Sequence, residues 1–234
     1  MLERLDYIRL DPGRVLDAGS GPPRRELRRR YPRAMAIALD FSLPMLEPRG
    51  LFRWASGERQ VSVCADMQML PLADASVDLV WSNMALHWLS DPLPALREFA
   101  RVLAPNGLVM FSTLGPDSLK ELRAAAGANR VHAFTDMHDL GDMLVAAGFS
   151  APVMDMELLH IDYADSAQLL DDLKRSGQTN ARVDRARGLA GRAFRDRLRA
   201  LPRRATFEVV YGHAWKRPAV ESAAKTVRVF KRIP

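Results

Sequence analysis

The sequence has 234 residues, of which 26% are charged and 48% hydrophobic, with a formal net charge of +6. A chain of this size can bury one sizeable core and is too apolar to be disordered. It contains no apolar run of the roughly 20 residues that a membrane span needs, and no basic-then-apolar leader. The single cysteine, Cys64, excludes an internal disulfide and a cysteine-rich metal site, and we expect its small side chain to be buried. These features predict a cytoplasmic protein without a metal.

Arginine dominates the basic residues and clusters between Arg24 and Arg33 and again between Arg175 and Arg204. Such a surface can bind nucleic acid, dock an acidic protein or simply be solvated. We do not expect nucleic-acid binding, because neither an aromatic stacking platform nor a recognition-helix motif accompanies the charge. The charge by itself leaves the other two interpretations open.

The first half of the chain alternates apolar runs with helical patterns. Residues 1–10 resemble the end of an amphipathic helix. Strands are then predicted, in chain order, at 15–16, 35–40, 61–66, 77–82 and 108–112. Helices are predicted at 22–31, directly after Ser42, and at 93–103. The run at 35–40 is continuously apolar, which is typical of a strand buried on both faces. The alternation predicts a parallel sheet with right-handed crossovers.

The regular alternation of predicted strands and helices ends after residue 113. Helices are predicted at 116–127, 139–147, 166–175 and 182–200, and strands at 154–163 and 205–215. We predict an α/β protein with a Rossmann-like, doubly wound, seven-stranded and mostly parallel sheet that carries a small helical cap. The expected division is a core at 1–113, cap insertions at 114–135 and 164–204, further parts of the core domain at 136–163 and 205–217, and a tail at 218–234.

A glycine turn follows the first strand, in the run Val15-Leu16-Asp17-Ala18-Gly19-Ser20-Gly21-Pro22. Glycines at 19 and 21 allow the main chain to approach a ligand closely, and the helix behind them offers free N–H groups. Open α/β sheets bind ligands at this carboxyl edge. The phosphate-binding pattern G-x-x-x-x-G-K-[ST] is absent, so a P-loop is excluded.

Polar side chains also end the following strands: Asp40, Asp66 and then Ser82-Asn83. Asp40 stands 23 residues after Asp17, close to the spacing at which a carboxylate accepts hydrogen bonds from two ribose hydroxyls. Asp66 could accept from the exocyclic amine of adenine, and two methionines could flank the purine: Met45 and Met67. We therefore favour a nucleoside-bearing ligand. The alternative is that each acid caps a helix and each methionine belongs to the core.

Four ordered segments resemble the motifs of class I S-adenosylmethionine-dependent methyltransferases: 15–22, 38–46, 65–71 and 78–83. Arg101-Val102-Leu103-x-Pro105-x-Gly107 continues the pattern. The resemblance implies the cofactor S-adenosyl-L-methionine, with Asp17, Gly19 and Gly21 beside its methionine part and Asp40 on its ribose. It places Asp66 and Met67 at the adenine, with Met45 close by, and Asn83 and Leu86 near the methyl donor.

A narrower similarity covers nearly the whole chain, through segments at 82–88, 112–122, 132–136, 139–141 and 206–211. These segments resemble the malonyl-acyl-carrier-protein O-methyltransferases of biotin synthesis. The resemblance implies that the partner is an acyl carrier protein bearing a malonyl thioester. A mitochondrial relative that hydroxylates an arginine and assists complex I assembly shares some of these features. A non-catalytic binding protein with the same fold is the third possibility.

The implied chemistry suits the residues. A malonyl carboxylate is ionised near neutral pH, so it needs no general base, and catalysis depends on positioning and desolvation. We expect His87 and Trp88 to form the substrate wall, and Arg123 or Arg130 to hold the substrate carboxylate. The basic stretch 182–204 would suit an acidic carrier protein.

Two departures from the family pattern bear on cofactor binding. Pro23 stands where the family has a third glycine, and proline removes a backbone donor. We also expect the chain to begin after the N-terminal segment that helps the family close its cofactor pocket. Both changes could weaken cofactor binding and leave the fold intact.

Overall fold

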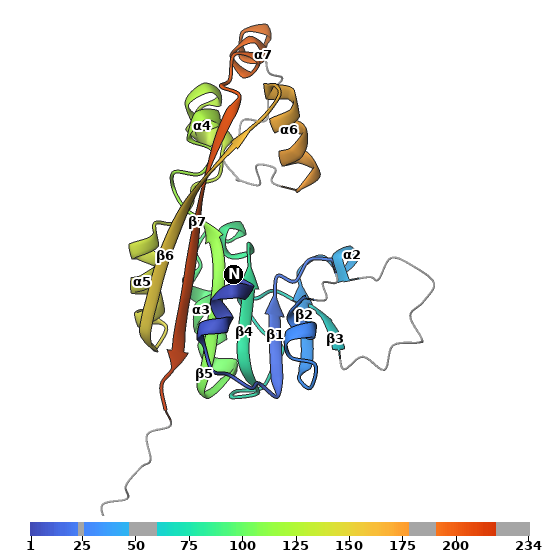
Figure 1. Ribbon diagram of the computed structural model, residues 1–234, viewed down its shortest axis with the longest axis vertical. Coiled ribbons are helices and arrows are strands. Elements are labelled where there is room, and N and C mark those ends of the chain that lie inside the picture. Colours follow the sequence, from blue (N-terminus) through green and yellow to red (C-terminus); the bar gives the residue numbers. More distant parts are fainter. Residues whose placement is uncertain (23–25, 47–59, 178–190, 219–234) are drawn as a thin grey trace, which may run out of the picture.

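A computed structural model describes residues 1–22, 26–46, 60–177 and 191–218. These residues form one seven-stranded sheet with the order β3-β2-β1-β4-β5-β7-β6 (Figure 1). Its strands are β1 (Arg14–Ala18), β2 (Met35–Asp40), β3 (Gln60–Cys64), β4 (Val77–Asn83), β5 (Leu103–Leu114), β6 (Phe149–Asp162) and β7 (Arg204–Lys216). Strand β7 is antiparallel to both of its neighbours, and the pairs from β3 to β5 are all parallel. The predicted mostly parallel α/β sheet is confirmed.

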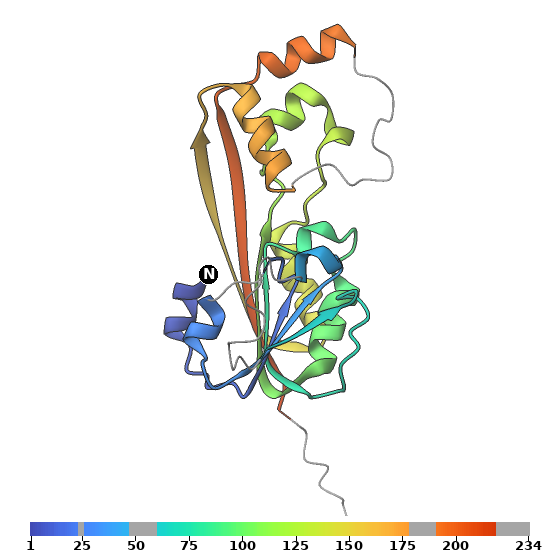
Figure 2. The same ribbon diagram turned by 90° about the vertical axis from the view of Figure 1, so that its right-hand side faces the viewer.

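Alternate residues of the central strands face opposite sides of the sheet. Leu16 and Val80 belong to the larger core, which includes residues of α3 (Leu93–Val102) and α5 (Met137–Ala146). Val15 and Leu79 face the other side and pack with η1 (Leu2–Tyr7) and residues around α1 (Glu26–Arg30). Figure 2 shows η1 and α1 on one side of the sheet and α3 on the other. The sheet is therefore covered on both faces, as a doubly wound fold requires.

The helix predicted at the N-terminus is present as a short 3₁₀-helix, anchored by the fully buried Leu5, in keeping with the use of 3₁₀ geometry in short pieces. Two predictions of burial were wrong. Cys64 is exposed because it ends β3, the strand at the sheet edge. The run at 35–40 is not buried throughout, since Met35 is 38% exposed and only Ala38 and Leu39 are buried.

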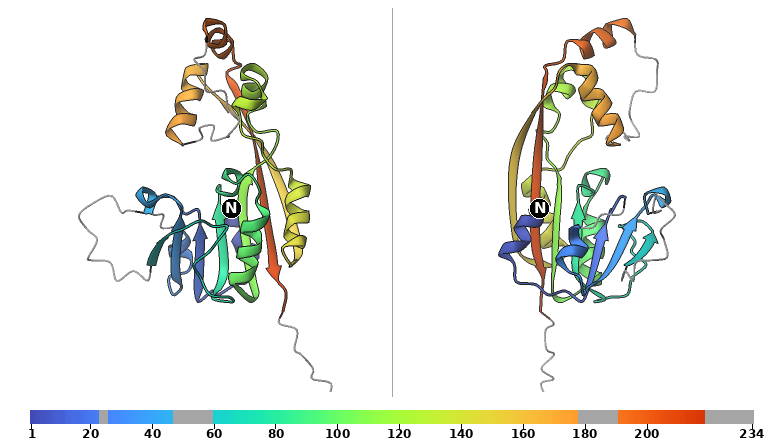
Figure 3. Two further views of the ribbon diagram at one scale, coloured as in Figure 1. Left: turned by 180° about the vertical axis from the view of Figure 1, so that it is seen from behind. Right: turned by 45° about the vertical axis from the view of Figure 1, so that its right-hand side comes forward.

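The strands β6 and β7 are longer than predicted and form a two-stranded ribbon that extends past the sheet (Figure 1). The helices that the structure describes at its far end are α4 (Lys120–Ala126), η3 (Ala128–Arg130), α6 (Ser166–Arg175) and α7 (Arg192–Arg199). Helix α4 starts later than predicted because residues 116–119 form a turn in which Leu119 has a φ of +55°. In Figure 3, seen from behind, α5 runs along the sheet part of β6 and the cap helices lie beyond it.

The helical cap has its own small core, separate from those of the sheet. Its buried members are Leu119, Val131, Leu169, Leu173 and Ala205. Because Ala205 and its partly buried neighbour Phe207 come from β7, the ribbon is common to the sheet and to the cap.

Some predicted features lie outside the described residues: Pro23, Arg24, Arg25, the part of the predicted helix at 182–190, and the tail from residue 219. Within the described parts, no helix combines the length and the apolar character that a membrane span requires. In α1, Arg29 is exposed as expected, but Arg28 and Arg30 are half-buried, and Arg30 forms an ion pair with Asp6.

A candidate cofactor and acceptor site

The glycine turn after β1 brings three loops together. Gly19 and Gly21 have φ angles of +72° and +59°, which favour glycine. A Cβ on Gly19 would lie 2.3 Å from the Cβ of Ala85 and 3.2 Å from the Cε of Met67. A Cβ on Gly21 would meet nothing within 4 Å. Gly19 thus allows the turns after β3 and β4 to pack on it, whereas the main chain at Gly21 has an open side.

Asp40 ties the glycine turn to the end of β2. Its Oδ2 accepts a hydrogen bond from the Gly21 N–H at 2.9 Å, and its Oδ1 accepts from the Ser42 N–H at 2.9 Å. Each carboxylate oxygen can accept a second bond. Because Asp40 is only half-buried, that capacity is available to hydroxyl donors of a ligand at the open side of Gly21.

Asp66 begins the turn after β3. Its Oδ1 accepts from the Gln68 N–H at 2.8 Å, and its carbonyl accepts from the Met69 N–H at 3.1 Å. Met67 of the same turn reaches back to Gly19. The predicted adenine residues therefore lie beside the predicted glycine turn.

Large apolar side chains are exposed in the same loops. Phe41 is 79% exposed, Met45 is 44% exposed and Met69 is 78% exposed. Sequence analysis predicted Met45 and missed Phe41 and Met69, although both follow closely on an acid that ends a strand. Such side chains are available to cover a flat, apolar ring.

The end of β4 is tied to β5 by polar contacts. The Oδ1 of Asn83 accepts from the Ser112 Oγ at 2.8 Å, and Met84, with a φ of +55°, donates its N–H to the Ser112 carbonyl. Leu86 begins η2 (Leu86–Trp88) and is fully buried in the main core. Leu86 therefore supports this turn from inside the core, and its predicted place near the methyl donor stays a prediction.

Asp17 is half-buried in β1, where its backbone pairs with Ala38 and Trp81. The strand ends thus provide half-buried carboxylates, one open stretch of main chain and exposed apolar side chains. This set fits an adenosyl group, whose hydroxyls and amine are donors and whose ring is flat. Among the described residues, no group of three or more metal-binding side chains is found.

Four rings join η2 to the segment that leads out of the cap. The centroid of Trp88 lies 5.4 Å from that of His87 and 5.5 Å from that of His132. Phe134 lies 6.1 Å from His87. His87 is only 6% exposed, whereas Trp88 is 39% exposed. His132 and Phe134 were not predicted as site residues, although the spacing His132-x-Phe134 was among the family-like segments.

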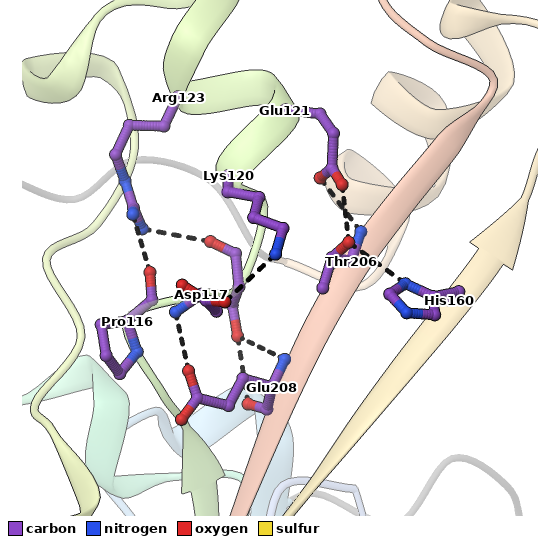
Figure 4. Close-up of polar contacts among 9 residues, drawn as sticks. Pro116, Asp117, Lys120, Glu121, Arg123, His160, Thr206 and Glu208 are labelled. Atoms are coloured by element: carbon purple, nitrogen blue, oxygen red, sulfur yellow. Dashed lines mark hydrogen bonds and ion pairs between the residues drawn. The ribbon is translucent and has the colours of Figure 1, made fainter.

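Arg123 closes the turn that leads from β5 into the cap. Its guanidinium donates to the carbonyls of Pro116 at 2.7 Å and Ser118 at 3.1 Å (Figure 4). The buried Glu208 of β7 accepts from the Asp117 N–H at 2.7 Å. Arg123 therefore has a fixed orientation at the base of the cap.

A second polar chain attaches α4 to the ribbon. Glu121 accepts from the Thr206 N–H at 3.1 Å and from the Thr206 Oγ1 at 2.6 Å, and this hydroxyl lies 3.2 Å from His160 (Figure 4). Burial acts to raise the pKa of Glu121, but the hydrogen bonds from Thr206 and from the backbone at 121, together with the charge of Lys120, outweigh it, and the pKa lies below its ordinary value. The ionised carboxylate is thus the form that joins α4 to β7.

Arg130 is engaged elsewhere in the cap. Its Cζ lies 4.1 Å from the ring centroid of Phe194 in α7, and Arg197 approaches the same ring at 5.8 Å. These are cation–π distances. The two predicted arginines thus have different neighbours, Arg123 on the turn at 116–118 and Arg130 on α7.

Comparisons with known proteins cover both the sheet and the cap. A family profile described as a methyltransferase domain matches residues 16–111. A malonyl-[acyl-carrier protein] O-methyltransferase of Laribacter hongkongensis is 49% identical, over 96% of this chain and 82% of its own length. This chain belongs to the malonyl-acyl-carrier-protein O-methyltransferase family. Enzymes of the same name from Methylovorus sp. and Nitrosospira multiformis are 48% and 42% identical, over 92% and 100% of this chain and 79% and 85% of their own lengths.

Solved structures agree with the fold of this methyltransferase. The YcgJ protein of Bacillus subtilis superposes with a TM-score of 0.64 at 21% identity, over 92% of this chain and 97% of its own. A phosphoethanolamine N-methyltransferase of Haemonchus contortus, solved with S-adenosylhomocysteine, has a TM-score of 0.58 at 17% identity, over 92% and 51% of the two chains. The class I methyltransferase fold is confirmed.

Proposed function

We propose that this methyltransferase moves the methyl group of S-adenosyl-L-methionine to the free carboxylate of a malonyl thioester carried by acyl carrier protein, as an early step of biotin synthesis. The main support is the extent of the family match, because relatives with this name match at least 92% of the chain. The match thus includes the cap as well as the cofactor edge of the sheet.

The cofactor supplies an electrophilic methyl group on a positively charged sulfur. We propose that Asp40 holds the ribose hydroxyls, since its carboxylate is held beside the open main chain of Gly21. Asp66 and Met67 would hold the adenine, with Met45 beside them. Asp17, Gly19 and Asn83 would line the methionine end.

The acceptor brings its own negative charge. A carboxyl group has a pKa of about 4. The malonyl carboxylate is therefore ionised at neutral pH, and no residue has to remove a proton from it. The protein has to position the carboxylate and exclude water. We propose that the rings of His87 and Trp88, with His132 and Phe134, form the wall that does so.

A cation should face the acceptor carboxylate. We favour Arg123 because two of its nitrogens are bonded to carbonyl oxygens, which fixes its orientation before the substrate arrives. Arg130 is the second candidate. Its packing on Phe194 suits a role in holding α7 against the cap.

The carrier protein requires a docking surface of opposite charge. Acyl carrier proteins are acidic, and the described part of the cap exposes several arginines: Arg192, Arg197, Arg199 and Arg203. We propose that the carrier protein docks on this side of the cap, which would deliver its flexible thioester arm toward the aromatic wall.

The test is a methyl-transfer assay with S-adenosyl-L-methionine and malonyl acyl carrier protein, in which mass spectrometry detects the methyl ester. We expect transfer to the malonyl carrier protein and little to free malonate. Methylation of free acids alone would contradict the proposed acceptor, and so would hydroxylation of an arginine peptide. Calorimetry with the cofactor tests the alternative of a non-catalytic protein, which would bind none.

A further inference from the structure

A half-buried ion pair outside the site makes hydrogen bonds to the loop that follows Asp66 and Met67. Arg101 lies at the end of α3, and its side chain is 31% exposed. It forms a two-pronged pair with Glu98, in which Nε and Nη2 donate to the two carboxylate oxygens at 2.7 Å each. Such fork-shaped pairs are geometrically specific.

The remaining bonds of Arg101 go to the loop after β3. Its Nη2 donates to the Leu70 carbonyl at 2.9 Å, and its Nη1 donates to the Leu72 carbonyl at 2.8 Å and to Asp74 at 2.7 Å. Glu98 completes the ring by accepting from the Leu70 N–H at 2.7 Å. The pair thus holds both the N–H and the carbonyl of Leu70.

Leu70 directly follows the turn at 66–69, which is closed by the Met69 N–H on the Asp66 carbonyl. Met67 in this turn packs on the main core and reaches Gly19. The contacts therefore form one path from Arg101 through Leu70 to Met67 and the glycine turn. A displacement of Leu70 would shift Asp66 and Met67 relative to Gly19.

We infer that Arg101 and Glu98 are positioning residues for the cofactor, which set the affinity for its adenosyl part through the loop at 66–74 without touching it. This inference rests on the proposed function, because it assumes that the loop holds the adenine. Hydrogen bonds from Arg101 keep the pKa of Glu98 below its ordinary value, so the pair stays ionised across the neutral range.

The test compares Arg101→Met and Glu98→Gln with the control Arg97→Met, which changes an exposed residue of the same helix. Calorimetry measures binding of S-adenosylhomocysteine and of 5′-methylthioadenosine, which lacks the amino-acid part. We expect both ligands to bind about 10- to 100-fold more weakly to the two variants, because a small displacement of the groups that line a site can cost about that much. The control should bind both normally.

Steady-state kinetics distinguish a specific loss of cofactor positioning from a general distortion of the folded protein. The KM for the cofactor should rise, while kcat and the KM for malonyl carrier protein stay within a factor of about two, because the acceptor wall lies on other elements. Glu98→Gln preserves volume and serves as the readout if Arg101→Met does not fold. Arg101→Lys should restore only part of the affinity, because a lysine cannot form the fork.

Normal binding of both ligands by a folded Arg101→Met or Glu98→Gln variant would overturn the inference. An equal rise in the KM for malonyl carrier protein would overturn it too, since that result indicates general damage. Failure of the unaltered protein to bind S-adenosylhomocysteine would instead refute the proposed function, and the inference with it.

Discussion

Asp40 and Gly19 each serve the fold and the candidate site at once. Asp40 uses both carboxylate oxygens to hold the backbone of the turns beside it, and this fixes the same carboxylate where ribose hydroxyls are expected. Gly19 has no side chain, so Met67 and Ala85 can fill the space beside it. Changes at these two positions should therefore have separable effects on cofactor binding and on stability.

Replacement of Asp40 by asparagine should weaken cofactor binding. The amide keeps one acceptor but loses the charge, and hydrogen bonds to charged groups contribute about 1.5–3 kcal/mol, which corresponds to roughly 10- to 100-fold in the dissociation constant. Calorimetry with S-adenosylhomocysteine measures the change. The exposed Asp142→Asn in α5 is the control. Equal affinities for the two variants would exclude a ribose-binding role for Asp40.

Replacement of Gly19 by alanine should destabilise the protein by about 1–3 kcal/mol, because the new Cβ combines positive-φ strain with a clash. The matched variant is Gly21→Ala, which has a similar φ of +59° but open space around it. The difference in free energy of unfolding between the two, measured with urea, isolates the packing contribution. A Gly21→Ala variant that is the less stable of the two would contradict this account.

The ribbon of β6 and β7 connects the sheet to the cap and carries the polar contacts that orient it. Glu208 on β7 holds the turn at 116–118, and Thr206 on the same strand holds Glu121 of α4. Because these contacts are two residues apart on one strand, a single element sets the position of both the Arg123 turn and α4.

The contact between Glu121 and β7 should depend on pH. The pKa of Glu121 is lowered in the folded protein, so its contribution to stability is complete above the unfolded value of about 4.3. This contribution is lost as the pH falls through the lower, folded pKa. Acid unfolding of Glu121→Gln should therefore depend less steeply on pH in this window than that of the unaltered protein. The exposed Glu3→Gln is the control, and identical acid unfolding of Glu121→Gln and unaltered protein would disprove the linkage.

In the proposed function, the molecule as a whole separates cofactor binding from docking of the carrier protein. Strand-end turns of the sheet form the candidate cofactor site, and the helical cap, with its own core, carries exposed arginines. The aromatic rings join the two parts at η2 and at residues 132–134. A carrier-bound substrate suits this division, because the carrier can dock on the cap while its thioester reaches the cofactor.

Charge reversal on α7 should affect the carrier-bound substrate alone. We expect Arg192→Glu combined with Arg199→Glu to raise the KM for malonyl carrier protein about tenfold at low salt, because complementary charge governs encounter. The effect should shrink at high salt. The KM for malonyl coenzyme A, which has no carrier protein, should stay unchanged. The control is Arg9→Glu, an exposed site just after η1, and an equal effect there would refute docking on α7.

Local patterns in the sequence determined the parallel sheet, the glycine turn and the acids at the strand ends, because strand periodicity and turn residues act over a few neighbouring positions. Asp40 and Met67 lie beside that turn in the structure, as the motifs led us to expect. The same motifs supported the family, which the comparisons confirm.

Only the tertiary structure decided which side chains meet across long stretches of chain. Cys64 is exposed because β3 is an edge strand, and Leu86 is buried because η2 turns into the main core. The carbonyl contacts of Arg123, the ring contacts of Trp88 with His132, and the hold of Arg101 on Leu70 depend on how distant elements pack. Such contacts follow from strand order and packing, which local patterns do not encode.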